Sequence, residues 1–301
     1  MKTKNTWLLR CSLNTFIFLL IFSLLSCVSS RHKAITGYDY RKLTTYKSET
    51  LNLFNLEYKK IAEGIFIARI ENTSLPLIAT IAKIDLKEQS LKIVATEKMR
   101  FKMNGSYAGF VEPETTLSFA KRFDTNLAIN ANFFTFKTSF FDKFYKPLGL
   151  FRNNGSLLSP SNEDFASMTF DKENLASVSD EDVKNAHFGI AGYNKVIEAG
   201  TVILKGKSRR IDSRILIGVN ERGSELFILL IDGERKSLSR GLALIDAANL
   251  FVQLGVFDGI ELDGGGSATL IAKIDGTQHQ LVPSSKKQCR RVAINLGFIS
   301  K

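Results

Sequence analysis

Short runs of hydrophobic residues, separated by polar turn residues, recur along most of the chain. The runs are rich in Ile, Val and Ala, and segments such as Asn-Thr-Ser and Lys-Glu-Gln-Ser interrupt them. This pattern predicts β-strands rather than long helices. The segment Arg-Asn-Asn-Gly-Ser, at residues 152–156, is typical of a tight hairpin turn. The predicted strands are residues 64–70, 77–86, 91–96, 126–130, 213–219 and 225–231.

Two segments have helical rather than strand-like patterning. Residues 114–123 predict a short helix with a threonine cap, and residues 239–254 predict a longer helix with a broad apolar face. Ser239 is in position to cap the longer helix, and Gly255 is in position to end it. With so few helices, the pattern predicts a single strand-rich α+β domain over residues 59–301.

The first 26 residues predict a lipoprotein signal peptide. Three basic residues precede an apolar segment, Phe16–Leu25, that is too short to span a bilayer comfortably. The segment ends in Leu-Leu-Ser-Cys, which resembles the lipobox of bacterial lipoproteins and predicts lipidation of Cys27. An ordinary cleaved signal and an uncleaved anchor are the alternatives. Residues 27–58 are polar and lack periodicity, so they predict a tether between the anchor and the domain.

This N-terminus predicts a protein of the cell envelope, lipid-anchored to a bacterial membrane and extracytoplasmic. The composition, 44% hydrophobic and 24% charged, is that of a globular protein. The net charge is +11, and +8 remains without the three basic residues of the signal. A basic surface favours anionic lipid or anionic glycan as a partner, whereas nucleic acid is not expected in an exported protein without a nucleic-acid motif. The alternative is a lysine-rich surface with no specific partner.

Cysteine and histidine usage bounds the chemistry. With Cys11 inside the signal and Cys27 lipidated, Cys289 remains alone, so no intrachain disulfide is expected. The three histidines are scattered and no zinc-binding spacing occurs, so we expect neither zinc nor another required cofactor. Calcium or magnesium stays open, because the chain offers carboxylates. A Gly-x-Ser-x-Gly elbow is absent from the sequence, which argues against a serine hydrolase.

The stretch Gly-Ile-Glu-Leu-Asp-Gly-Gly-Gly-Ser, at 259–267, is the most unusual in the chain. Glu261 and Asp263 are two apart on a predicted strand and therefore share one face, with Leu262 facing the core. Two neighbouring carboxylates repel each other, so one of them should hold its proton more tightly than normal. The glycines that follow let the backbone approach a ligand and offer N–H groups to an anion. An exposed polar strand face ending in a tight hairpin is the alternative.

Further candidates for substrate contact lie at the ends of other apolar runs. Amides can hydrogen-bond sugar hydroxyls, arginines can bind phosphate, and a carboxylate after an apolar strand can assist the other two. Side chains that satisfy local turns, or that simply lie on the surface, are the alternatives. The candidates are Asn130, Asn132, Arg214, Asp232, Ser239, Gly264, Gly265, Gly266, Ser267 and Arg290.

Several segments together resemble the phosphodiester glycosidase family, most strongly over residues 125–299. The most specific is Leu-Asp-Gly-Gly-Gly-Ser. The others are Ile-Asn-Ala-Asn-Phe-Phe at 129–134, the segments 146–158 and 213–220, the rest of 226–271, and Cys-Arg-Arg-Val-Ala-Ile-Asn-Leu-Gly-Phe at 289–298. Two positions depart from the family pattern. Ala131 stands where the family usually has glycine, and Ile294 stands where it has asparagine.

The resemblance implies a hydrolase that cleaves a sugar from a glycosyl 1-phosphodiester, similar to an N-acetylglucosamine-1-phosphodiester, in envelope or extracellular polysaccharide. Asp263 is then the carboxylate closest to the chemistry, assisted by Glu261 and Asp232, and Arg214 and Arg290 bind the phosphate. The alternative function is a lipoprotein that binds anionic glycan without catalysis, which the departures at Ala131 and Ile294 favour.

Overall fold

The computed structural model of the chain describes residues 45–47, 53, 56–72, 76–97, 110–138, 143–179, 185–204, 210–233, 238–282 and 290–301. The chain divides into two units, residues 1–37 and 38–301, and every described residue belongs to the second.

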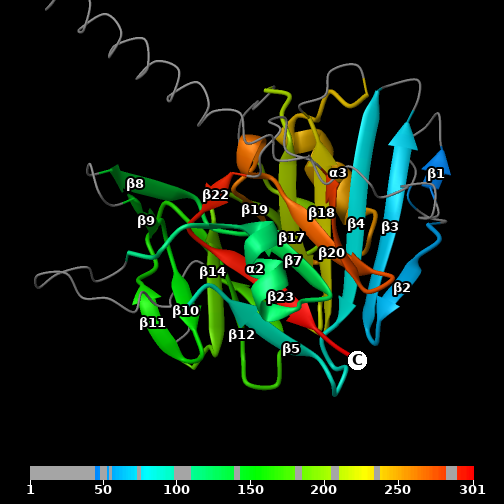
Figure 1. Ribbon diagram of the computed structural model, residues 1–301. Helices are drawn as coiled ribbons and strands as arrows, with labels where there is room; N and C mark the ends of the chain where they lie inside the picture. The colour runs from blue at the N-terminus through cyan, green and yellow to red at the C-terminus, as the bar shows by residue number, and fades with distance from the viewer. Residues whose placement is uncertain are drawn as a thin grey trace, which may run out of the picture. The chain divides into compact units, whose positions relative to one another are not determined.

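The most hydrophobic runs of the sequence form the largest sheet of this unit (Figure 1). Its strands are β1 (Thr45–Lys47), β2 (Lys59–Ala62), β3 (Ile65–Asn72), β4 (Leu77–Asp85), β15 (Lys195–Glu198), β16 (Thr201–Val202), β17 (Arg214–Val219), β18 (Glu225–Asp232) and β19 (Asp258–Leu262). They run in the order β1-β3-β4-β18-β17-β19-β15-β16, and β2 also pairs with β3. β1 and β3 are parallel, and the other pairs are antiparallel.

Two smaller sheets lie on one face of the large sheet. The first has the order β21 (Thr277–Val282), β20 (Leu270–Ile274), β7 (Leu127–Asn130), β23 (Asn295–Ile299), β5 (Lys92–Ala95). The second has the order β11 (Ser156–Ser159), β10 (Phe151–Asn153), β14 (Phe188–Gly192), β12 (Ala166–Phe170), β13 (Ala176–Ser179). Two short ribbons pair β6 (Glu114–Thr115) with β22 (Arg291–Val292), and β8 (Phe134–Thr138) with β9 (Lys143–Pro147).

Alternation along the strands builds a core on each face of the large sheet. Ile215, Ile217 and Ile260 face the two smaller sheets and belong to the main core cluster. Leu216 and Leu229 face the other way and pack against helix α3 (Leu244–Val252). Helix α2 (Thr116–Phe123) covers the outer face of β7 and β20 (Figure 1). The central strands are therefore buried on both faces, which explains why they are almost continuously apolar.

The predicted architecture is confirmed: the described residues are rich in strands and contain few helices, as expected of an α+β domain. The predicted strands 64–70, 77–86, 91–96, 126–130, 213–219 and 225–231 correspond to β3, β4, β5, β7, β17 and β18. The short helix is capped by the Thr115 hydroxyl, which accepts a hydrogen bond from the Ser118 N–H. The hairpin at 152–156 joins β10 and β11.

The longer predicted helix is shorter than expected. α3 begins at Leu244, its N-cap is Ala243, and Ser239 does not cap it. Gly241 has a φ of 86°, which a right-handed helix cannot contain, and Leu242 pairs with Asp212 through two backbone hydrogen bonds. The Ser239 hydroxyl instead donates to the Asp232 carbonyl and accepts from the Ile78 N–H. Residues 239–243 therefore join neighbouring strands rather than starting a helix.

The tether predicted over residues 27–58 extends too far. β1 pairs with β3, and Leu53 is only 4% exposed within the core beside α3. Burial, and to a lesser degree the charge of Glu225, raises the pKa of Tyr58 to about 12. Residues 45–47, 53 and 56–58 are thus part of the folded unit, because a few apolar side chains in a polar segment are enough to dock it. Residues 1–44, with the predicted signal and Cys27, lie outside the described residues.

No helix within the described ranges is both long and apolar enough to cross a bilayer.

Candidate active site

Strand β19 carries the carboxylate motif into the interior of the unit. It lies between β17 and β15, so its backbone is fixed on both sides. Ile260 and Leu262 belong to the main core cluster, as the alternation predicted. Glu261 projects from the opposite face of β19 and is only 4% exposed. The carboxylate pair therefore does not lie on an open polar strand face.

The Glu261 carboxylate is held by two side chains from neighbouring strand ends. Arg214 Nη1 donates to Glu261 Oε1 at 2.7 Å, and Asn194 Nδ2 donates to Glu261 Oε2 at 2.9 Å. The Arg214 Nη2 and Nε groups donate to the carbonyls of Arg210 and Leu242, at 2.7 and 3.3 Å. Arg214 was predicted to bind phosphate, but its side chain is only 12% exposed and each of its three guanidinium nitrogens donates to an acceptor within the protein. It neutralises Glu261, because a buried carboxylate without a cation would be costly.

Asp263 follows directly after the end of β19 and is partly buried. Burial raises the pKa of its carboxyl to about 6, against the lowering effects of a hydrogen bond from Ser267 and the charge of Arg290. The charge of Glu261 raises it further but is the smallest of these effects. The predicted direction of the shift is therefore confirmed for Asp263, whereas its main cause is desolvation and not repulsion between the carboxylates.

Ser267 and Arg290, both predicted site residues, lie beside Asp263. Arg290 Nη1 donates to Ser267 Oγ at 3.3 Å, and the Ser267 hydroxyl is hydrogen-bonded to the Asp263 carboxylate. Ser267 is fully buried, whereas Arg290 is exposed. Arg290 is thus the cation that an anion arriving from solvent would meet next to Asp263.

The glycine loop serves close packing more than anion binding. Gly265–Ser267 form one turn of 3₁₀-helix, and the N–H groups of Gly265, Ser267 and Ala268 bond to the carbonyls of Ser213, Gly264 and Gly265. A Cβ on Gly264 would lie 2.7 Å from the Ser213 carbonyl oxygen, and Gly265 has a φ of 53°. Since the Gly265 N–H is already used, the loop does not offer all three glycine N–H groups to an anion.

Asn130, at the end of β7 in the first smaller sheet, and Asn132, in the segment that follows it, brace the site. Asn130 Nδ2 donates to the Asp263 carbonyl at 2.7 Å, and its Oδ1 accepts from the Thr269 N–H at 2.9 Å, so it joins the two ends of the glycine loop. Asn132 Nδ2 donates to the carbonyls of Leu148 and Leu150. Both residues are at most 1% exposed. This geometry favours a positioning role over the predicted contact with sugar hydroxyls.

Two predicted site residues lie at or after the end of β18 and not on β19. Asp232 ends β18, two strands away from β19, and alternation places its side chain on the face of Leu230, opposite to that of Glu261. It is fully buried. Ser239 is also fully buried, in the contact between Asp232 and Ile78 described above. The sequence suggested Asp232 because it follows an apolar strand. The Ser239 side chain links the end of β18 to β4.

Both departures from the family pattern also lie in the core. Ala131 and Ile294 belong to the main core cluster, and each is 0% exposed to solvent. The Ala131 N–H donates to the Ile294 carbonyl at 2.9 Å, and the Ala131 carbonyl accepts from the Asp263 N–H at 3.0 Å. Because both side chains are buried, these two departures do not remove a contact with substrate and give no support to a loss of catalysis.

Sequence reasoning missed the turn Gly192-Tyr193-Asn194, which follows β14. The Tyr193 N–H donates to the Glu261 carbonyl at 3.0 Å, and Asn194 supports the Glu261 carboxylate as described. A Cβ on Gly192 would lie 2.2 Å from the Glu261 carbonyl oxygen. The available signal was a tyrosine between a glycine and an asparagine. Nothing local in the sequence connects this turn to Glu261, which follows Asn194 by 67 residues.

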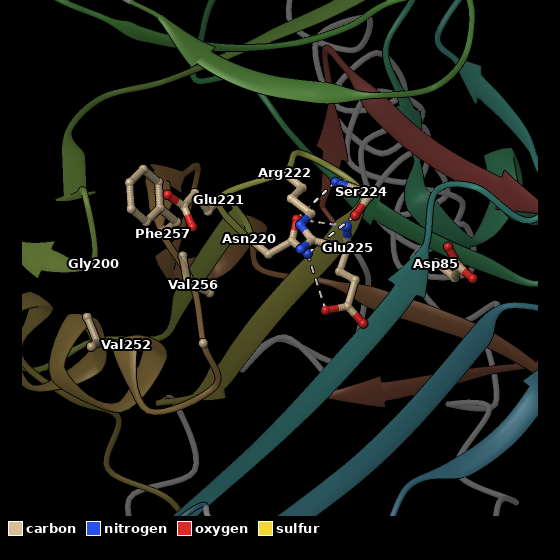
Figure 2. A pocket seen from close by; sticks show the side chains of 11 residues that line it. Asp85, Gly200, Asn220, Glu221, Arg222, Ser224, Glu225, Val252, Val256 and Phe257 are labelled. Atoms are coloured by element: carbon tan, nitrogen blue, oxygen red, sulfur yellow. Dashed lines mark hydrogen bonds between the residues drawn. The ribbon is translucent and has the colours of Figure 1, made fainter.

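A separate cleft of about 680 Å³ lies at the opposite end of the same strands. Figure 2 shows it around the β17–β18 turn, where the Asn220 side chain accepts hydrogen bonds from the Ser224 and Glu225 N–H groups. The length of β17, from Arg214 to Val219, separates this turn from the Arg214 end by roughly 16 Å at about 3.3 Å per residue. The cleft is therefore not the site formed around Asp263.

Within the described ranges, no three His, Cys, Asp or Glu side chains are grouped as metal ligands. That catalysis needs no metal stays a prediction.

Comparisons with known proteins bear on this arrangement. The family model of the phosphodiester glycosidases matches residues 123–299, which is more than half of the chain. No curated protein sequence is similar enough to this chain to count as a match.

Solved structures share the fold at low sequence identity. The zebrafish N-acetylglucosamine-1-phosphodiester alpha-N-acetylglucosaminidase catalytic domain, auto-inhibited by its pro-peptide, is 20% identical with a TM-score of 0.57, over 85% of this chain and 87% of that one. A hypothetical protein from Synechocystis is 13% identical with a TM-score of 0.61, over 82% of this chain but only 64% of its own length. A candidate exported protein from Burkholderia pseudomallei is 13% identical with a TM-score of 0.50, over 76% and 75% of the two chains.

Proposed function

This chain belongs to the phosphodiester glycosidase family, and from that premise we propose that it hydrolyses a glycosyl 1-phosphodiester, releasing the sugar and leaving a phosphomonoester. The observation that carries the proposal is Asp263. It is a partly buried carboxyl whose pKa is raised to about 6, near the start of the family's most specific motif and beside the exposed Arg290. A carboxyl near neutral pKa next to a cation suits a site that handles both a developing positive carbon and a phosphate.

The reaction assigns a distinct task to each group. Water adds to the anomeric carbon as the bond from that carbon to the phosphate oxygen breaks, and the phosphate keeps the electron pair. Phosphate is already a good leaving group, so the site needs little proton donation to it. The ionised Asp263 carboxylate takes the proton from water or stabilises the positive charge that develops on the anomeric carbon. Arg290 binds the phosphate oxygens, and the buried Ser267 hydroxyl orients the Asp263 carboxylate.

Glu261 and Arg214 act through position and not through direct contact with substrate. Their ion pair is largely buried and Asn194 fixes it, so it gives rigid support to the end of β19, from which Asp263 follows. This support keeps the Asp263 carboxylate in one geometry, which matters because catalytic groups lose most of their effect when displaced by about 1 Å.

The proposed substrate is an N-acetylglucosamine-1-phosphodiester or a similar group in envelope or extracellular polysaccharide. The likeness to the zebrafish glycosidase domain supports the sugar class, and the likeness to a candidate exported protein supports a place outside the cytoplasm. Anchoring through a lipid on Cys27 is part of the same proposal.

Turnover of a panel of glycosyl 1-phosphodiesters tests the function directly. We expect release of free sugar from at least one α- or β-linked N-acetylhexosaminyl methyl phosphodiester. In water enriched in ¹⁸O, the methyl phosphate product should carry no label, because water attacks carbon and not phosphorus. Label in the phosphate would contradict the proposed bond cleavage. Binding of these compounds without any product would instead identify a non-catalytic protein that binds anionic glycan.

A further inference from the structure

The proposed function assigns groups to the phosphate and to the anomeric carbon but none to the sugar ring. We infer that Tyr193 supplies this missing contact: its exposed ring, held by Phe133 and Phe165, stacks on the pyranose ring of the glycosyl group. The inference rests on the proposed function for the identity of the ligand, and on the geometry around β19 for the position of the contact.

The backbone fixes Tyr193 beside the carboxylates. Its N–H donates to the Glu261 carbonyl at 3.0 Å, and the next residue, Asn194, donates to the Glu261 carboxylate at 2.9 Å. Gly192 approaches the same carbonyl so closely that a Cβ would lie 2.2 Å from it. The turn that carries the tyrosine is thus fastened to β19 two residues before Asp263.

A second segment brings Phe133 to the same place. The Ala131 carbonyl accepts from the Asp263 N–H at 3.0 Å. The Asn132 side chain then donates to the Leu148 and Leu150 carbonyls, and the Leu148 N–H donates to the Phe133 carbonyl at 2.8 Å. The brace made by Asn132 therefore determines where the Phe133 ring lies relative to Asp263.

The three rings form one cluster with Tyr193 on its outside. The Tyr193 ring meets Phe133 and Phe165 edge to face, with centroids 5.9 and 5.6 Å away, and the two phenylalanine rings are 6.5 Å apart. Phe165 is 9% exposed, whereas Tyr193 is 54% exposed. Among the large hydrophobic side chains exposed in the described ranges, Tyr193 is the aromatic one; the others are Leu157, Leu175, Ile211 and Leu238. Its ring is presented to solvent in a supported orientation.

Ring chemistry matches this surface to a sugar. The ring oxygen and the hydroxyl oxygens of a pyranose polarise its C–H bonds, and the electron-rich face of an aromatic ring attracts such C–H groups. The phenolic hydroxyl can also exchange hydrogen bonds with sugar hydroxyls. Arg290 bonds to Ser267, which follows Asp263 in the chain. Tyr193 bonds to Glu261, which precedes Asp263. A substrate with its phosphate at Arg290 and its sugar on Tyr193 would bring the anomeric carbon to Asp263.

Direct binding measurements on the full chain test the inference. The probes are N-acetylglucosamine 1-phosphate, glucose 1-phosphate and galactose 1-phosphate, with dimethyl phosphate as a phosphodiester that lacks a sugar. Tyr193→Ala should weaken binding of the preferred sugar phosphate by about tenfold, the scale of one lost aromatic contact and its buried area. Tyr193→Phe should stay within about threefold, because the ring remains. Leu157→Ala removes an exposed side chain on the edge strand β11 and serves as the control.

Selectivity separates a sugar contact from a structural effect. Tyr193→Ala should leave the affinity for dimethyl phosphate unchanged while the sugar phosphate is lost, which a general loosening of the site would not do. Unchanged binding of sugar phosphates by Tyr193→Ala would overturn the inference, and so would a wild-type protein that binds none of them. Binding through Tyr193 without turnover of any phosphodiester would overturn the proposed function alone.

Discussion

At the scale of single residues, Asp263 and Arg290 determine how the site responds to pH. Desolvation raises the pKa of Asp263 to about 6, and the positive charge of Arg290 lowers it. The proposed role requires the ionised carboxylate. The rise of activity with pH therefore reports the protonation of one side chain.

We predict that kcat/KM rises as the pH increases through about 6 and levels off above it. Replacing Arg290 by Gln removes a positive charge that favours the carboxylate, so the rise should move to higher pH, and the KM for a phosphodiester should increase. Arg222→Gln, at the distant β17–β18 turn, is the matched control. Activity that falls through this pH range would mean that the protonated acid, and not the carboxylate, acts in catalysis.

Because the pKa of Asp263 is raised, the ionised carboxylate that the proposed function requires should lower the stability of the folded protein. The unfolded carboxyl titrates near its ordinary value of 3.8, so the favourable contribution of the protonated native form is complete below that pH and is lost as the pH rises through about 6. Asp263→Asn should therefore raise the free energy of unfolding at pH 8, on the order of 2 kcal/mol, and change it little at pH 3.5. Thermal or denaturant unfolding at both pH values measures this. Asp246→Asn, on the exposed side of α3, is the control, and equal shifts at both pH values would contradict the account.

At the scale of elements, the strands could be predicted from the sequence because each hydrophobic run is local. The helix 239–254 could not, because its start depends on Leu242 pairing with Asp212 and on Ser239 joining β18 to β4. The site residues could likewise be predicted only where a local signal in the sequence marks them. Asp263, Ser267 and Arg290 were predicted because a glycine-rich motif and a family resemblance mark them, whereas Asn194 reaches Glu261 from the turn between β14 and β15 and leaves no local signal.

The ion pair between Arg214 and Glu261 gives a test at this scale. Arg214→Met leaves a buried carboxylate without its cation, so the protein should lose about 3–5 kcal/mol of stability. The double variant Arg214→Met, Glu261→Gln should recover part of that loss, because the uncompensated charge is gone. Urea unfolding of the two single variants and the double variant gives the coupling. A stable Arg214→Met protein with only an increased KM would instead identify Arg214 as a phosphate contact.

At the scale of the whole molecule, the large sheet holds two different ends. One end carries the carboxylates with Tyr193 and Arg290, and the other carries the cleft at the β17–β18 turn. Composition and charge predicted a globular, basic protein and the N-terminal segment predicted export, but none of these could separate the two ends. The separation comes from strand order, in which β19 is enclosed by β17 and β15. That order brings together residues that are far apart in the sequence, so only the folded chain reveals it.

The N-terminal segment extends the account beyond the described residues. If Cys27 is lipidated, the protein made from the full sequence should partition with membranes, since stable anchoring requires more than one acyl chain and bacterial lipoproteins carry such a group. Cys27→Ser should move it to the soluble fraction, and Cys289→Ser should not. Mass spectrometry that finds an unmodified N-terminus beyond position 27 would contradict lipidation without affecting the assignment of the site.

The most direct test of the account is the turnover number of Asp263→Asn on the glycosyl phosphodiester that the wild-type protein hydrolyses best. Asparagine keeps the size of the side chain and can still bond to Ser267, but it can neither accept a proton from water nor balance positive charge on the anomeric carbon. We predict that kcat falls by roughly a hundredfold or more, the usual scale for such a group, while affinity for the phosphodiester changes much less. A folded Asp263→Asn protein that turns over this substrate at the wild-type rate would contradict the central claim.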